Sequence, residues 1–217
     1  TIQVGATGTH QAIIKKNDFL LAETVPLDVT SFEYPTRVTP KFASATTLAS
    51  DYADYGWTDE EASGTWEITQ DSSDGTQVGW KAFDKTATSS SIWHSSSSNM
   101  ATDPHWITIR YPDATIVKRY RLWDRGYSQS TGRWFPRIWT LQGSNDGTNW
   151  TNVGDEQQED SWTYVANKAH MKEYNVTNDK AYTHYRLNIT SGRYANSNSS
   201  TDYSYVVISE WELDSEI

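Results

Sequence analysis

The sequence predicts an all-β protein, folded as an antiparallel β-sandwich. Short runs that alternate apolar and polar residues recur from Gly64 onward with turn residues between them, as in sandwich domains. The pair Asp146-Gly147 lies between two aromatic-rich runs and is typical of a β-hairpin, because Gly adopts a positive φ without steric cost. No long stretch shows the 3.6-residue apolar period of a helix. We therefore expect less than about a tenth of the chain in α-helix.

Four segments show the strand pattern most clearly: Trp66–Ile68, Trp106–Tyr111, Tyr185–Ile189 and Val206–Ile208. Pro104 and Pro112 bracket the second segment, since a strand tolerates a missing N–H at its ends. In the third, Tyr185, Leu187 and Ile189 share one face and polar residues share the other, which predicts one buried side and one wet side. The fourth is apolar throughout, so we expect a central strand covered on both sides.

The stretch Tyr120–Trp150 organises the rest of the chain. It opens with a strand, passes through the polar loop Asp124–Pro136, returns to a strand at Ile138–Gln142 and reverses at Ser144–Gly147. The loop is dense in Arg, Tyr, Gly and Trp. We expect it to project from one end of the sheet and to carry side chains for recognition.

Length and composition indicate one domain, or one domain with an arm. The chain has 217 residues, 36% of them apolar, and no apolar run long enough for a membrane span or a signal peptide. We expect an arm of short strands at Thr1–Arg37 and the folded domain at Val38–Ile217. The pattern at Ser50–Tyr55 is too brief to decide whether a short helical turn lies there. The start at Thr1, without Met, suggests a processed or trimmed fragment.

Charge and residue usage exclude several classes of partner and site. The net charge of −10 disfavours nucleic acids and anionic membranes, because both need a basic surface. Cysteine is absent, so disulfides and thiolate metal sites are excluded. Tryptophan (11) and tyrosine (13) are abundant; most should lie in the core, and those on loops suit the apolar faces of sugars. Two long polar loops, Thr86–Thr102 and Ser191–Ser204, could carry such rings.

A set of motifs then occurs in a fixed order: Lys81-Ala82-Phe83-Asp84, Ile92-Trp93-His94-Ser95, Trp106-Ile107, Tyr120-Arg121-Leu122, Trp139 to Trp150 with Leu141-Gln142-Gly143-Ser144-Asn145-Asp146-Gly147, Tyr185-Arg186-Leu187 and Ser209-Glu210-Trp211-Glu212-Leu213. This order resembles the discoidin or coagulation-factor C-type domain, a galactose-binding-like jelly roll that includes the family 32 carbohydrate-binding modules. The resemblance covers Val38 to Leu213. The wording of the motifs is also similar to modules in phage tail and other virion proteins.

The resemblance implies a structural Ca²⁺ site. Its expected ligands are Asp84, the carbonyl of Lys81 and Glu210 in the last strand. Trp93 lies two residues further from Asp84 than is usual in the family, so Ser89 or Ser91 replaces the expected Thr. A tight loop that offers carbonyl, carboxylate and hydroxyl oxygens suits Ca²⁺. The alternative is that Asp84 only caps a turn through its own backbone.

The resemblance also implies a sugar site. The family's His position is matched by His94 and its Arg position by Arg125, while Thr131, before Gly132-Arg133, stands where the family has Asn, and Ser97 stands where it has a stacking aromatic. A sugar needs a few polar donors and one aromatic platform. The expected ligand-binding residues are therefore His94, Arg125, Thr131, Arg133, and the possible platforms Tyr127, Trp134 and Tyr194. Two alternatives stay open: Arg125 pairs with a carboxylate such as Asp124, and His94 has no ligand.

Three function classes follow. The first is a non-catalytic module that binds host-surface glycans, extracellular or on a virion, such as a phage tail receptor-binding protein that attaches to its host. The second is a virion structural or decoration module that binds protein, or an accessory module of a secreted bacterial glycosidase. The third, an enzyme, is disfavoured, because the acidic clusters lie in expected loops and no hydrolase or phosphate-binding motif is present. The arm could also mediate homo-oligomerisation.

Overall fold

The computed structural model describes residues 14–16, 19–21, 36–100, 102–125, 133–160, 170–195 and 200–216. Its internal contacts divide the chain into two units, Thr1–Tyr34 and Pro35–Ile217. In the first unit, β1 (Ile14–Lys16) and β2 (Phe19–Leu21) form an antiparallel pair. In the part of the chain that is described, no helix is long and apolar enough to cross a membrane.

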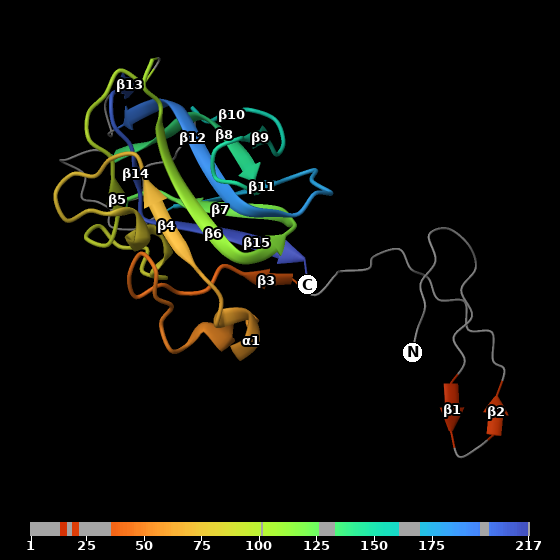
Figure 1. Ribbon diagram of the computed structural model, residues 1–217. Helices are drawn as coiled ribbons and strands as arrows, with labels where there is room; N and C mark the ends of the chain where they lie inside the picture. The colour runs from red at the N-terminus through yellow and green to blue at the C-terminus, as the bar shows by residue number, and fades with distance from the viewer. Residues whose placement is uncertain are drawn as a thin grey trace. The chain divides into compact units, whose positions relative to one another are not determined.

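The second unit is a β-sandwich (Figure 1). The larger sheet has seven strands: β4 (Glu67–Gln70), β6 (His105–Thr115), β8 (Arg133–Ser144), β9 (Thr151–Asn152), β10 (Gln157–Gln158), β12 (Tyr182–Ala195) and β13 (Ser200–Tyr203). Its order is β10-β8-β12-β6-β4, with β13 beside β12 and β9 beside β8. The smaller sheet has the order β11-β7-β15-β3, from β3 (Thr36–Val38), β7 (Val117–Trp123), β11 (Met171–Asn175) and β15 (Glu210–Glu216).

The remaining elements are short. A two-stranded sheet joins β5 (Trp93–His94) to β14 (Val207–Ile208). The helical segments are the 3-10 turns η1 (Tyr52–Tyr55) and η2 (Gly79–Phe83) and the single-turn helix α1 (Asp59–Ala62). This confirms the all-β class. The segment Ser50–Tyr55, where the sequence pattern is too brief to decide, contains η1. The strand β3 pairs with β15, so Thr36 and Arg37 join the smaller sheet.

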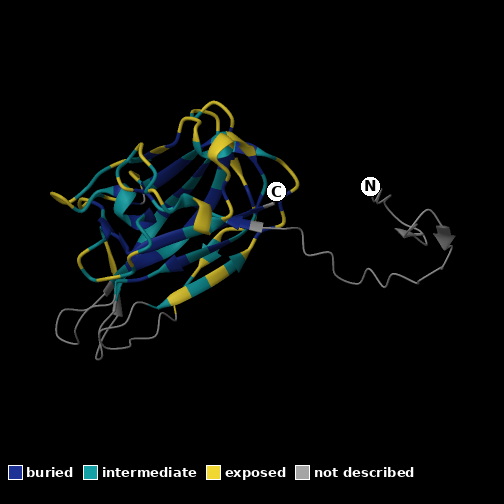
Figure 2. Ribbon diagram, turned by 90° about the horizontal axis from the view of Figure 1, so that it is seen from below, coloured by how far each residue is buried: buried dark blue, intermediate teal, exposed yellow. Residues whose placement is uncertain are grey.

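The core lies between the two sheets (Figure 2). Strand alternation places Ile107, Ile109 and Leu187 inward from the larger sheet, each 0% exposed, and Leu213 and Trp211 inward from the smaller one. The indole Nε1 of Trp139 donates to the hydroxyl of Tyr120 at 2.9 Å, so a polar contact inside the core also joins the two layers. The inward face predicted for the third strand segment is confirmed, since Tyr185, Leu187 and Ile189 are all buried.

Two sequence predictions of strand limits were wrong. Pro112 lies inside β6, opposite a register shift in β12 between Tyr182 and His184, so its missing N–H interrupts no regular ladder there. Strand β8 begins at Arg133 and not near Ile138, because β12 continues to Ala195 and pairs with β8 from His184 to Ala195. The loop expected at Asp124–Pro136 is correspondingly shorter.

The run Val206–Ile208 is buried as predicted, but it is not a central strand. Val207 and Ile208 pair only with the two-residue strand β5, at the end of the sandwich. Their burial comes from packing against β8 and the hydrophobic core rather than from strands that flank them in a large sheet. The predicted reversal is confirmed: Gly147 has φ of 71°, and Asp146 accepts the backbone N–H groups of Thr148 and Asn149 at 2.8 and 2.7 Å.

Candidate functional site

His94 is held outward at one end of the sandwich by its buried neighbours. Trp93 is fully buried, and its indole Nε1 donates to the carbonyl of Ser72 at 2.9 Å. Ser95 is also buried: its hydroxyl accepts the backbone N–H of Val206 at 3.0 Å, and its own N–H donates to the Val206 carbonyl at 3.1 Å. Because both neighbours point inward, the alternation of the strand turns the His94 imidazole the other way.

The electrostatic setting keeps the His94 imidazole neutral. Its Nδ1 lies 2.8 Å from Oε1 of Gln77, an acceptor that assigns the ring proton to Nδ1. Burial lowers the pKa of His94, and the charge of Arg125 lowers it further, while Asp74, 3.6 Å away, opposes both. The neutral ring therefore has a lone pair on Nε2 that can accept a hydrogen bond.

The rings of Trp134 and Tyr205 lie beside His94, and those of Tyr194 and Tyr203 lie beside these two in turn. We call the five residues the aromatic cluster: His94, Trp134, Tyr194, Tyr203 and Tyr205. The Trp134 ring lies 5.3 Å from those of Tyr194 and Tyr205 and is nearly parallel to His94 at 6.1 Å. Tyr203 is 42% exposed, a large value for an aromatic residue beside other rings. The cluster therefore offers apolar ring surface to solvent at this end of the molecule.

Trp134 and Tyr194 lie on strands, and the prediction that they lie on loops was wrong. They face each other in the β8–β12 register, and β12 continues through a hairpin into β13. Gly192 allows this arrangement, since a Cβ there would lie 2.7 Å from the carbonyl oxygen of Tyr205. A platform built on paired strands is more rigid than one on a loop.

A cavity of about 320 Å³ opens beside the cluster. It is lined by Asp74, His94, Ser95, Ser96, Ser97 and Tyr205. The hydroxyls of Ser97 and Ser204 lie 2.7 Å apart, so Ser97 supplies a polar wall. A carboxylate, an imidazole and several hydroxyls beside one ring can orient a hydroxylated ligand of about one sugar ring.

Arg125 follows β7 and contacts the loop at Thr86–Thr102, which we call the serine-rich loop. Its Nε donates to the carbonyl of Ser89 at 3.1 Å, and its charge acts on the pKa of His94, so the two predicted donors belong to one region. The preceding Asp124 is buried, and its Oδ1 accepts the backbone N–H of His170 at 2.6 Å. That contact anchors the base of the segment that carries Arg125.

Several predicted residues cannot be placed here. Tyr127 and Thr131 lie outside the described residues, and Arg133 is described only as the first residue of β8. The structure in turn adds Asp74, Gln77 and Tyr205, which sequence reasoning missed. The spacing of Tyr203 and Tyr205, two residues apart before the apolar run Val206–Ile208, was the one signal that could have indicated a shared face.

The expected metal ligands meet in a second region. Asp84 follows η2, and its Oδ1 accepts the N–H of Thr86 at 2.9 Å, which confirms the turn-capping role. Its Oδ2 accepts a hydrogen bond from the hydroxyl of Ser91, so of the two expected serines it is Ser91 whose side chain the structure shows bonded to Asp84. Lys81 lies within η2, three residues before Asp84. Asp84 can cap its turn with one oxygen and still offer the other to a cation.

Glu210 is the informative member of this region. It is 2% exposed, and neither of its carboxylate oxygens has a hydrogen-bond partner among the described residues. Burial raises its pKa well above the usual value, and the charges of Glu212 and Asp84 raise it further. The charge of the Lys85 ammonium, 3.8 Å from Oε1 of Glu210, lowers the pKa and so opposes this shift. The backbone N–H of Lys85 also lowers the pKa, although it does not reach hydrogen-bond geometry. A buried carboxylate so poorly compensated fits the ligand set of a cation.

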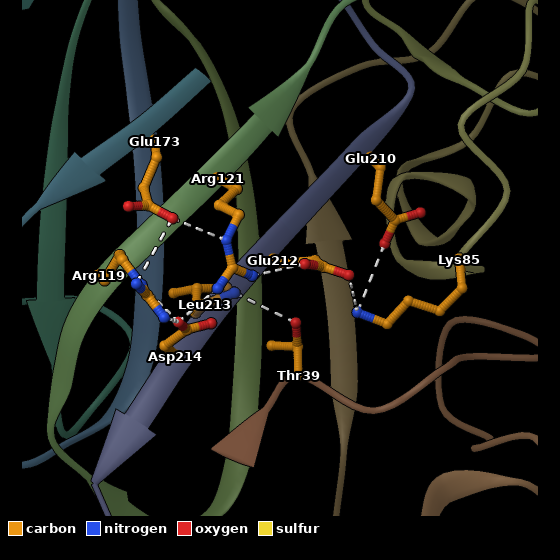
Figure 3. A network of polar contacts seen from close by, with 9 residues as sticks. All are labelled: Thr39, Lys85, Arg119, Arg121, Glu173, Glu210, Glu212, Leu213 and Asp214. Atoms are coloured by element: carbon orange, nitrogen blue, oxygen red, sulfur yellow. Dashed lines mark hydrogen bonds and ion pairs between the residues drawn. The ribbon is translucent and has the colours of Figure 1, made fainter. Parts of the chain in front are cut away.

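Lys85 is not a full substitute for a metal ion. Figure 3 shows its ammonium between two carboxylates, and it lies nearer to Glu212, at 2.9 Å, than to Glu210. Glu212 is also paired with Arg121 at 2.8 Å. Among the described residues no three His, Cys, Asp or Glu side chains converge on one point, so a Ca²⁺ here would also draw on a hydroxyl and backbone carbonyls. The donor set fits that ion.

Neither a family model nor a curated protein matches this sequence. Solved structures do. The family 32 carbohydrate-binding module CBM32-3, from a family 31 glycoside hydrolase of Clostridium perfringens, is 17% identical with a TM-score of 0.51, over 70% of this chain and 91% of that one. The family 32 module of NanJ from the same organism, in complex with galactose, is 14% identical with a TM-score of 0.45, over 69% and 93%.

A third structure, the C. perfringens module CpGH89CBM32-5 in complex with GalNAc-β-1,3-galactose, is 16% identical with a TM-score of 0.48, over 68% of this chain and 94% of that one. At such identities the similarity to CBM32-3 shows the fold alone. The chain shares with that module the β-sandwich that its ordered motifs predict.

Proposed function

We propose that the second unit, Pro35–Ile217, is a non-catalytic carbohydrate-binding module that recognises a cell-surface glycan at the aromatic cluster. The observation that carries this proposal is the neutral His94, fixed through Nδ1 beside a polar cavity and the ring of Tyr205. A sugar placed there would donate a hydroxyl to Nε2 and rest its apolar face on an exposed ring. Arg125 is the second proposed donor. The shared fold with CBM32-3 agrees with this reading.

Asp71, His105 and Ser98 are arranged like a catalytic triad, but their contacts support a structural role. Nδ1 of the buried His105 lies 2.6 Å from Asp71, and its Nε2 lies 3.2 Å from the Ser98 hydroxyl and 3.1 Å from the carbonyl of Ser204. Burial lowers the pKa of His105, but Asp71 more than offsets this, so the pKa is raised overall. A charged imidazole that donates from both nitrogens has no lone pair with which to activate Ser98. We assign this group to structure.

We further propose a Ca²⁺ ion held by Asp84, Ser91 and Glu210, with the carbonyl of Lys81 as a fourth ligand. When bound, the ion would neutralise Glu210 and tie the serine-rich loop to β15. That loop also accepts the Arg125 side chain at Ser89. The metal would therefore act on the sugar site by fixing its frame, and not by contact with the ligand.

The parent protein is proposed to be extracellular or part of a virion, with a phage tail receptor-binding protein favoured by the wording of the motifs. A single shallow site has few hydrogen bonds to set against the cost of association, so we expect a dissociation constant of about 0.1–1 mM for a monosaccharide. Useful attachment would then require several copies on one surface, as in a homo-oligomer joined through the arm.

A glycan array of the full chain, displayed in multivalent form, tests the proposal. We expect selective binding to a few glycans, with loss of signal in His94→Ala and in Arg125→Ala. Lys41→Ala serves as the matched control, because Lys41 is half-buried, pairs with Asp51 and does not line the cavity beside His94. If no glycan binds, or if both site variants bind like the wild type, the function as a glycan receptor is refuted and the protein-binding alternative gains support.

A further inference from the structure

A second cavity, of about 270 Å³, lies on the outer face of the seven-stranded sheet. It is lined by Glu67, Thr69, Trp106, Thr108, Gly147, Trp150, His184 and Arg186, and none of these residues lines the cavity beside His94. The lining comes from three strands that are adjacent in the sheet, β4, β6 and β12 (Figure 1), and from the turn that joins β8 to β9. The two cavities therefore form independent surfaces of one unit.

The floor of this cavity contains a buried hydroxyl without a partner. Thr108 is 5% exposed, and its Oγ1 makes no hydrogen bond. It stands between Thr69 of β4 and Arg186 of β12 in the strand register. Buried polar groups are usually satisfied, because each one left without a partner destabilises the fold. A polar ligand in the cavity would supply the missing partner.

Arg186 provides a positive charge for which the described part of the chain shows no carboxylate partner. Its Nε and Nη2 donate to Oε1 of Gln142 at 2.9 and 2.6 Å, and its guanidinium stacks on the Trp150 ring at 4.1 Å. The end-on N–H groups on Nη1 and Nη2 have no partner among the described residues. Burial alone lowers the pKa of Arg186, with no carboxylate contribution to raise it. The side chain is thus fixed in orientation while one edge stays available.

The rest of the lining sets the ligand class. Glu67 is exposed at the rim, and its partner in the β4–β6 register is the positively charged Arg110. Burial lowers the pKa of His184, so its ring is neutral and can exchange hydrogen bonds with hydroxyls. Trp106 is half-buried beside them and provides a ring of the kind on which sugars stack. A ring platform, hydroxyl partners and an uncompensated guanidinium complement a sugar that carries a carboxylate.

We propose that this face is a second saccharide-binding site, selective for acidic sugars, in which Trp106 stacks on the sugar ring, Arg186 binds its carboxylate end-on and Thr108 accepts or donates a hydrogen bond to a hydroxyl. The site goes beyond the proposed function at the aromatic cluster and does not depend on it. Recognition of two sugars by one unit would raise the avidity of the parent protein for a surface that carries both.

Calorimetric titration of the full chain with three acidic oligosaccharides tests the proposal: trigalacturonate, triguluronate and a hyaluronan tetrasaccharide. We expect at least one to bind with a dissociation constant of about 0.1–1 mM, and a neutral galactose trisaccharide to bind at least tenfold more weakly at this face. Raising the salt concentration should weaken the acidic ligand, since part of the affinity is an ion pair.

Variants separate this site from the first. Trp106→Ala and Arg186→Met should each reduce affinity for the acidic ligand at least tenfold, and Met keeps an apolar side chain of similar length at position 186 without the charge. Lys41→Met controls for the loss of one positive charge, and His94→Ala controls for the aromatic cluster; both should bind like the wild type. Thr108→Val should weaken binding yet melt at the same or a higher temperature, because it removes the buried hydroxyl that lacks a partner.

Each of the following results would overturn the proposal. None of the three acidic oligosaccharides binds with a dissociation constant below about 10 mM, or both Trp106→Ala and Arg186→Met bind like the wild type. The proposal also fails if the neutral trisaccharide binds this face as well as the acidic ones. Loss of binding in His94→Ala with no effect of Trp106→Ala would place the acidic sugar at the aromatic cluster and would equally refute a second site.

Discussion

Replacement of Glu210 by Gln tests the metal region, because we expect the variant to be more stable than the wild type without Ca²⁺ and less stable than the wild type with it. In the absence of metal, Glu210 is a buried carboxylate whose pKa is raised well above 4.5. Such a group destabilises the folded state at neutral pH by about 1.4 kcal/mol for each unit of the shift. Glutamine has the same shape without the charge, and Lys85 keeps its closer partner Glu212. In EDTA at pH 7.5 the variant should therefore melt at a higher temperature than the wild type.

Calcium should invert this order. An ion that binds only the folded state stabilises it by about 2.7 kcal/mol when its concentration is a hundredfold above the dissociation constant. For domains of about 150–250 residues each kcal/mol raises the melting temperature by about 2–4 °C. The wild type should thus gain about 5–11 °C on addition of Ca²⁺, and Glu210→Gln should gain much less.

The pH dependence provides an independent check on the same carboxylate. Because its folded pKa is raised, metal-free wild-type protein should be most stable below the unfolded value near 4.5 with respect to this group, and should lose that stability as pH rises toward the folded pKa. The variant should lack this component. Differential scanning calorimetry in EDTA and in Ca²⁺ across pH 4–8 measures both effects. A wild-type curve unchanged by Ca²⁺, together with a variant less stable in EDTA, would refute the reasoning.

His105→Gln should destabilise the protein most at acidic pH. Because the folded pKa of His105 is raised, its contribution to stability is complete below about pH 6.5 and is lost as pH rises through the folded pKa. Urea unfolding at pH 5.5 and 8.5 measures the difference, and an equal loss of stability at both pH values would contradict the prediction. Arg125→Ala should abolish binding to an array-identified glycan with a melting temperature within about 2 °C of the wild type. Tyr203→Ala, at a residue 42% exposed, should weaken the same glycan by about 1–2 kcal/mol without loss of stability, as measured by calorimetry; wild-type affinity would exclude Tyr203 as platform. Glycan affinity should be constant from pH 8 to 6.5 and fall only below it, because the pKa of His94 is lowered.

The sequence predicts the sandwich and its core faces well, and it predicts the site only in part. Alternation along Tyr185, Leu187 and Ile189 identifies a buried face because strand periodicity is local. The beginning of β8 at Arg133 depends instead on the partner strand β12, which lies about 60 positions away in sequence, as pairing of Ala195 with Arg133 shows. The local pattern around Arg133 contains Pro136, which disfavours a strand, and it does not show which residues of a distant strand pair with this segment.

The site shows the same division. His94 and Arg125 were indicated by their positions in motifs, and the structure places them in one region. Gln77 and Asp74 reach His94 only because the segment before η2 folds back on β5, where the N–H of Asp74 donates to the His94 carbonyl at 2.8 Å. In the sequence, Thr108 is an ordinary polar residue of a strand. Only the neighbouring strands show that its hydroxyl is buried without a hydrogen-bond partner among the described residues. Chemistry that depends on tertiary contacts requires the fold.

The most direct test of the central claim is a nuclear magnetic resonance titration of the ¹⁵N-labelled full chain with a glycan identified on the array. The backbone amides of His94, Ser96, Ser97 and Tyr205 and the indole of Trp134 should shift together and saturate with one dissociation constant. The imidazole Nε2 of His94 should respond as a hydrogen-bond acceptor, with its proton retained on Nδ1. Shifts confined to other surfaces, with these signals unmoved at saturation, would contradict a glycan site at the aromatic cluster.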